Sequence, residues 1–153
     1  MAGNDRWTWA GEHVPGLRGQ GFYLAASTDR EHVENALLAA GYAVRTASGG
    51  SAARSAMARL SSAVGQAEVT NLDAFADVLA DLTPATAGSD RLALLWLDAG
   101  ELVRADLADF LALTEILRDA STDAWDPAND DDPANVVFET VALIDGFGVE
   151  PLG

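Results

Sequence analysis

The chain has 153 residues, 49% hydrophobic and 22% charged, and a formal net charge of −15. Its length and composition fit one globular domain with its own core and exclude an intrinsically disordered chain. The negative charge argues against nucleic acid or an anionic membrane as a direct partner and suits a basic ligand. Adaptation of the proteome to salt, or solubility alone, explains the charge equally well.

Several classes of protein are excluded by residues that the chain lacks. It has no cysteine, so disulfides, zinc–thiolate sites and thiol nucleophiles are ruled out. The first residues do not show the charged and apolar regions of a secretory signal. No apolar run reaches the roughly 18 residues of a membrane span. We therefore expect a soluble cytoplasmic protein without a membrane partner.

Strands and helices alternate along most of the chain, which predicts an α/β fold with a small parallel sheet packed with helices. Ser27 or Thr28 and Ser51 are expected to cap two of the helices. The predicted elements are an irregular arm over 1–20, a strand over 21–26, a helix over 29–40, a strand over 42–46, helices over about 52–64 and 71–82, a loop over 83–90, a strand over 91–97, a turn over 98–100, a helix over 106–120, an acidic loop over 121–135, a strand over 135–143 and a loose tail over 146–153.

The segment Asn71-Leu-Asp-Ala-Phe-Ala-Asp-Val-Leu-Ala-Asp81 predicts an amphipathic helix with a one-sided charge. Asp73, Asp77 and Asp81 recur at i, i+4 and i+8, so they line one face. Like charges at this spacing cost roughly 0.2–0.5 kcal/mol per pair, and only Asp73 is favoured by the helix dipole. The opposite face is predicted to be buried and consists of Leu72, Phe75, Val78, Leu79 and Leu82. The stripe is either a solvated helix face or the contact for a cationic surface.

The sequence offers little catalytic material. His13 and His32 lack a triad context and are interpreted as surface residues, and the glycines of 16–21 lack the strand and helix of a phosphate loop. The run 126–132 resembles a calcium loop in charge only, because the central Gly and terminal Glu of an EF-hand are missing. We therefore expect no enzyme activity, no cofactor and no metal. A metal-dependent hydrolase with paired carboxylates stays a minor alternative.

The residues from 71 to 79 resemble the signature helix of the barstar family, small intracellular inhibitors of barnase-type ribonucleases. The order of the flanking elements over about 42–143 agrees, including the strand Arg91-Leu-Ala-Leu-Leu-Trp96 and the helix end Leu117-Arg-Asp-Ala120. The resemblance implies three core strands. It divides the chain into the arm, one domain over 21–145 with an added βα unit at 21–41, and the tail. The added unit is expected to place a fourth strand at one edge of the sheet.

In the barstar family, helix carboxylates enter the nuclease active site in place of the substrate phosphate and pair with its basic side chains. The resemblance therefore implies an immunity-type inhibitor of a basic ribonuclease or related toxin. It makes Asp77 the main phosphate mimic, Asp73 its partner and Asp119 a further acidic contact. Asn71 and Asp81 complete the candidate partner-binding residues. A non-inhibitory adaptor or regulatory protein that retains the fold is the alternative.

The chain departs from the family pattern around the signature helix. The preceding segment, which usually carries aromatic residues and a Gly, is Gln66-Ala-Glu-Val-Thr70 here. The family's tryptophan positions within and just after the helix are Ala76 and Leu82. These departures favour a target other than barnase.

Overall fold

The computed structural model describes residues 9–49, 51–129 and 131–152. The strands are β1 (Arg18–Gly19), β2 (Phe22–Ala26), β3 (Ala43–Ala47), β4 (Arg91–Trp96) and β5 (Val137–Ile144). The helices are η2 (Ala10–Glu12), η3 (Ser27–Asp29), α1 (Arg30–Ala39), α2 (Ala53–Ala63), α3 (Leu72–Ala80), α4 (Pro84–Ala87), α5 (Ala99–Ala105), α6 (Leu107–Asp123) and η4 (Pro127–Asn129).

The five strands form one sheet in the order β1-β2-β5-β4-β3. The four longer strands are parallel. The two-residue strand β1 pairs antiparallel with β2 and forms the edge of the sheet on that side. The added strand β2 pairs with β5, with Phe22 opposite Thr140. This pairing confirms the expected α/β fold and the added strand at one side of the core strands.

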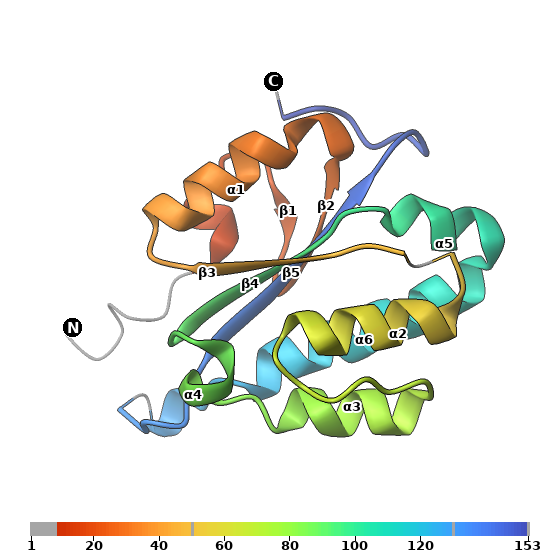
Figure 1. Cartoon of the computed structure of the whole chain (residues 1–153). Coiled ribbons are helices and arrows are strands. Elements are labelled where there is room, and N and C mark those ends of the chain that lie inside the picture. The colour runs from red at the N-terminus through yellow and green to blue at the C-terminus, as the bar shows by residue number, and fades with distance from the viewer. Residues whose placement is uncertain (1–8, 50, 130, 153) are drawn as a thin grey trace.

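Helices cover both faces of the sheet (Figure 1). On one face, α2, α3, α5 and α6 enclose the larger apolar cluster, which includes Leu60, Phe75, Trp96 and Phe138. On the other face, α1 and the N-terminal segment enclose a second cluster around Tyr23 and Trp125. The strand β5 is buried along its whole length because both faces and both edges are covered.

Two segments that were expected to be irregular are helical. Residues 83–90 contain α4, because Thr83 and Thr86 form a reciprocal capping box and Pro84 occupies the first helical turn. The expected turn at 98–100 is instead the beginning of α5, which packs against α6 and β5. Tertiary packing supports this second helix, and its short glycine-containing sequence carries no periodic signal for it.

The predicted helix ends need three corrections. Neither Ser27 nor Thr28 caps α1, because a 3-10 turn occupies both positions and Asp29 is the N-cap. Ala52 is the N-cap of α2 in place of Ser51, without a side-chain hydrogen bond. The last long helix, α6, continues to Asp123, beyond the predicted end at residue 120 and into the predicted acidic loop.

The exposed face of α6 also differs from the expectation. The apolar spacing of this helix predicts one buried side made of Leu107, Phe110, Leu111, Thr114 and Leu117. Of these residues, Leu107 and Leu111 are instead 54% and 55% exposed. Phe110, Thr114 and Leu117 are buried as this pattern predicts, and Leu113 joins them, because α6 packs against α3, α5 and the sheet on that flank.

The two chain ends contact the body of the domain. The described part of the arm contains η2 and β1, and Trp9 lies half-buried against the domain. Trp7 lies outside the described residues. Leu152 in the tail packs against the second cluster, and its N–H donates to Asp29 at 2.8 Å, whereas a loose tail was expected.

Candidate partner-binding surface

The helix α3 is fixed at its N-terminus by a side-chain cap. Asn71 adopts an extended backbone conformation, and its side-chain oxygen accepts a hydrogen bond from the Ala74 N–H at 2.8 Å. The pattern Thr70-Asn-Leu-Asp73 resembles a capping box and predicts Thr70 as the cap, but the N-cap is Asn71, one residue later. Asn is among the best N-cap residues because its short side chain reaches these otherwise unpaired donors.

The buried face of α3 follows the predicted helical spacing. Phe75, Leu79 and Leu82 are 0%, 1% and 5% exposed and belong to the larger core cluster. Val78 is half-buried, whereas Leu72 is 44% exposed and is not part of the core. This packing fixes the rotation of α3 about its axis and hence the direction of its polar face.

Asp73 and Asp77 stand on the opposite side of α3 and are exposed. At 100° per residue, Asp77 points directly away from the midpoint between Phe75 and Leu79, and Asp73 lies about 40° to one side of that direction. Within the described part of the chain, no ion pair or hydrogen bond involves the carboxylate of either residue. Both carboxylates are therefore available to a partner.

Asp81 differs from these two residues in its position on the helix. It is the C-cap residue of α3, and its backbone N–H donates to the Val78 carbonyl. Its side chain is exposed, but the negative end of the helix dipole opposes its charge. The fold therefore separates Asp81 from Asp73 and Asp77, although the three share one stripe in sequence.

Asp119 lies on α6, which packs directly against α3. Its neighbours Arg118 and Thr122 line a hollow beside Gly19 and Phe22 at the β1–β2 edge. Asp119 is rotated by about 100° around α6 from Arg118, so its side chain points away from this hollow. It is exposed, so the fold places this acidic side chain on the helix next to the signature helix.

The loop before α3 adds a residue that the sequence interpretation missed. The side-chain amide of Gln66 donates to the Val78 carbonyl at 2.9 Å, which ties the loop to the helix. Glu68, in the same loop, is exposed and is a further carboxylate beside the N-terminus of α3. A side chain that reaches twelve residues along the chain leaves no local sequence pattern, which is why this contact was not predicted.

The positions that carry tryptophan in the family differ in exposure. Ala76 is exposed on α3, whereas Leu82 is buried in the core. The exposed apolar surface of α3 is therefore limited to Leu72 and small alanines, and carboxylates dominate its outer face.

The acidic segment 121–135 uses part of its charge internally. Asp126 accepts hydrogen bonds from the Asn129 side chain and the Ala128 N–H, both at 3.0 Å. The hydrogen bond from Asn129 contributes most to lowering the pKa of Asp126, and the bond from Ala128 lowers it further. Trp125 is buried in the second cluster and fixes the start of the segment.

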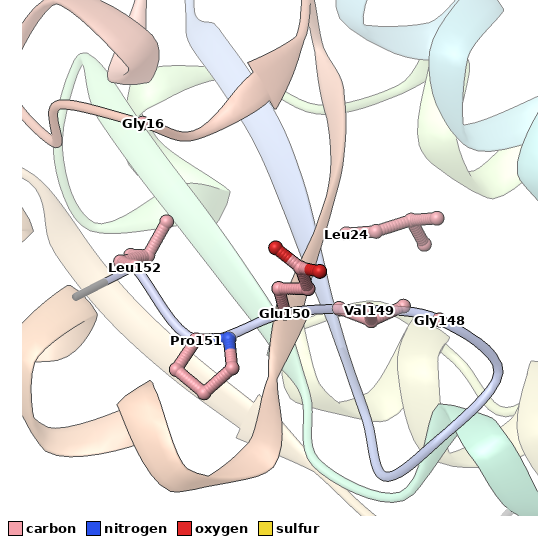
Figure 2. Close-up of a pocket in the computed structure, with 7 residues that line it drawn as sticks. All are labelled: Gly16, Leu24, Gly148, Val149, Glu150, Pro151 and Leu152. Atoms are coloured by element: carbon pink, nitrogen blue, oxygen red, sulfur yellow. The ribbon is translucent and has the colours of Figure 1, made fainter.

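Two hollows of the described surface lie away from α3. One, of about 500 Å³, lies between Gly16, Leu24 and the tail residues 148–152 (Figure 2). The other, of about 670 Å³, lies between Trp9, the β1–β2 turn and α6. Over the same residues, no group of three or more His, Asp or Glu side chains is arranged to hold a metal ion. The candidate surface is the exposed acidic face of α3.

No helix in the described ranges combines the length and the apolar character that crossing a membrane requires.

Comparison with known protein families agrees with this geometry. Residues 53–139 match the family model described as Barstar (barnase inhibitor). The match covers more than half of the chain and extends from α2 into β5, so it includes α3 and α6. The chain belongs to the barstar family. None of the curated proteins and none of the solved structures that were compared matches it significantly.

Proposed function

We propose that this protein binds a basic ribonuclease, or a related toxin, and blocks its active site with the carboxylates of α3. One observation carries the proposal: Asp73 and Asp77 project from a capped, core-anchored helix and have no partner within the described residues. Membership of a family of barnase inhibitors supports the same function. Acting inside the cell that makes the toxin, the protein would serve as an immunity protein.

The physical basis is the mimicry of phosphate charge. A ribonuclease active site holds basic side chains that pair with substrate phosphate, and two fixed carboxylates offer the same charge and hydrogen-bond acceptors. Because α3 is already rigid in the free protein, little conformational entropy is lost on binding. A net charge of −15 would speed the encounter with a positively charged partner.

The acidic surface extends beyond the two central residues. Asp119 on the neighbouring helix and Glu68 on the tied loop would contact the rim of the nuclease site, where charges act more on association than on affinity. Asn71 would act mainly through its cap, because its side-chain oxygen is already bonded to Ala74. Asp81 would contribute least, since it lies at the opposite end of α3.

We propose that the target is a nuclease other than barnase. With Leu82 in the core and Ala76 small, the outer face of α3 lacks the aromatic surface that the family pattern includes. A binding energy that depends on charge more than on apolar contact favours a nuclease with an unusually basic cleft.

A direct experiment is a titration of candidate basic ribonucleases with the purified protein, read as inhibition of RNA cleavage. We expect stoichiometric inhibition of one nuclease, and the Asp73→Asn/Asp77→Asn double variant should lose it. Tight binding without inhibition would favour the non-inhibitory adaptor that the fold also permits. Inhibition that survives in the double variant would refute the role of α3.

A further inference from the structure

The face of the sheet opposite α3 contains one buried carboxyl group among the described residues. Glu139 lies on β5 and is 0% exposed, within a cluster that is otherwise apolar. Burial of a carboxylate destabilises a protein unless hydrogen-bond donors surround it, so the fold must supply donors to Glu139.

Three donors from distant parts of the chain converge on Glu139. The Ala10 N–H donates to both carboxylate oxygens, at 3.0 and 2.9 Å. The Tyr23 hydroxyl donates to one oxygen, and the Tyr42 hydroxyl donates to the other at 2.5 Å. The partners are 129, 116 and 97 residues away along the chain, so the group joins the N-terminal segment, β2 and the start of β3 to the central strand.

The N-terminal segment 9–17 reaches Glu139 from outside the sheet, whereas Tyr23 and Glu139 lie on the paired strands β2 and β5. It packs Ala10, Val14 and Leu17 into the second cluster, and η2 lies beside α1 on that face (Figure 1). The Ala10 N–H is its polar contact with β5. Release of the segment would uncover Glu139 and remove this backbone donor.

We propose that Glu139 is a latch that holds residues 9–17 against the sheet, so that docking of this segment is coupled to the protonation of one buried carboxyl group.

Charged and titratable groups on every neighbouring element face this latch. They are His13 from the segment, Tyr23 from β2, Tyr42 before β3 and Arg91 from β4, whose guanidinium lies 5.8 Å from the centre of the Tyr42 ring. Burial raises the pKa of Glu139, and the bonds from Tyr23, Tyr42 and Ala10, together with the charge of His13, only partly oppose this. Burial and the nearby carboxylate also raise the pKa of both tyrosines.

The direction of the coupling follows from the pKa of Glu139. Burial is the largest cause of the raised pKa of Glu139 and outweighs the opposing bond from Ala10. Because docking of the segment completes this burial, docking favours the protonated carboxyl group, and acid favours the docked segment. Docking should weaken as pH rises from the ordinary glutamate range through the raised pKa. When Glu139 is ionised, the Ala10 N–H still bonds the segment to β5, but docking then buries a charge.

Amide hydrogen exchange tests the latch on the full chain, with protection factors followed for Ala10, Val14 and Leu17. In wild-type protein we expect protection of these amides to fall as pH rises from 5 to 8. Gln is neutral at every pH and resembles the protonated carboxyl group, so in Glu139→Gln the pH dependence should vanish and protection at pH 8 should stay near its value at pH 5. Phe75 in α3 should keep its protection, because it lies on the other face of the sheet.

Further variants distinguish the titration of Glu139 from the titration of His13 or of surface carboxylates. Glu31→Gln changes an exposed glutamate on α1 and should behave as wild type. His13→Gln should keep the pH dependence if Glu139 is responsible. Should Glu139→Gln fail to fold, Tyr42→Phe removes one donor to the carboxylate, so it should raise the pKa of Glu139 further and move the fall in protection to higher pH.

Three results would overturn the latch. The first is a pH dependence of the segment's protection that is the same as in wild type in both Glu139→Gln and Tyr42→Phe. The second is an equal loss of protection at Phe75 and in the segment, which would make Glu139 a general core residue. The third is a pH dependence that disappears in His13→Gln and persists in Glu139→Gln.

Discussion

The side-chain oxygen of Asn71 lies 2.8 Å from the backbone nitrogen of Ala74 and accepts its hydrogen bond. This cap sets where α3 begins, and the burial of Phe75 and Leu79 sets how the helix is rotated. Together the cap and the core contacts place Asp73 in the first turn and Asp77 one turn later, both facing solvent. The candidate site is therefore a consequence of one polar contact and one apolar face.

Replacing the cap should destabilise the protein. We expect Asn71→Ala to lower the free energy of unfolding by about 0.5–2 kcal/mol, because the Ala74 N–H loses its acceptor. Urea unfolding measures the change. Asn71→Asp keeps an acceptor at the helix N-terminus and should retain nearly all the stability, so equal losses in the two variants would argue against the cap.

The carboxylates of α3 should contribute unequally to binding. We expect Asp77→Ala to weaken the complex with the cognate nuclease by more than about 2 kcal/mol, roughly 30-fold in Kd, as for a desolvated hot-spot charge. Barnase and barstar are themselves standard examples of such hot spots, so this magnitude is not independent of the family. Isothermal titration calorimetry gives the comparison.

The matched control for Asp77 is Asp81→Ala on the same helix. It removes the same charge from the other end of the exposed stripe and should change Kd less than about threefold, as for a charge at the rim of an interface. Equal effects of the two substitutions would mean that total charge, and no particular position, governs binding.

Association should depend strongly on salt. Because the net charge is −15 and the proposed partner is basic, steering should raise the association rate at low ionic strength. Stopped-flow measurements from about 0.01 to 1 M salt, where the screening length falls from about 30 to 3 Å, should show a steep decline. Dissociation should change much less, and a rate of association independent of salt would exclude steering.

Introducing the family's tryptophan just after α3, at Leu82, should destabilise the protein. Leu82→Trp enlarges a side chain that is 5% exposed, so overpacking should cost about 1–3 kcal/mol of stability. Ala76→Trp places the same ring on the exposed face and should cost far less. Thermal unfolding of the two variants makes the comparison, and equal stability would show that the core around Leu82 has unfilled space.

The free energy of unfolding should depend on pH through the protonation of Glu139. Its folded-state pKa is raised by burial, so its stabilising contribution is fully present below the ordinary value of 4.5 and is lost as pH rises through the raised pKa. Relative to Glu139→Gln, wild-type protein should therefore gain stability between pH 7 and 5. Denaturant unfolding at both pH values tests this, and Glu31→Gln, which removes only an exposed carboxylate, should show no such difference from wild type.

Some elements of this protein follow from local sequence. The apolar spacing of residues 72–82 predicted α3 and most of its buried face, and the run from Arg91 to Trp96 predicted a strand buried in a parallel sheet. These predictions succeeded because periodicity and burial are recorded residue by residue. The motif of α3 and the order of its neighbours also pointed to the barstar family, which the family model confirms.

Other elements were decided only by contacts between distant residues. The helix α5 exists because its segment packs on α6 and β5, and Leu107 is exposed because α6 turns another flank to the core. The tie between Gln66 and Val78 and the bonds from Ala10, Tyr23 and Tyr42 to Glu139 join residues that are 12 to 129 positions apart. No local pattern records such pairs.

The sequence by itself determined the α/β class, the acidic face of α3 and the family. The tertiary structure alone decided that β2 joins β5, that Asp119 lies on the helix packed against α3, and that a carboxyl group is buried behind the N-terminal segment. The reason is physical: amphipathic patterns encode which side of an element is buried, whereas the neighbour that covers it depends on how the whole chain packs.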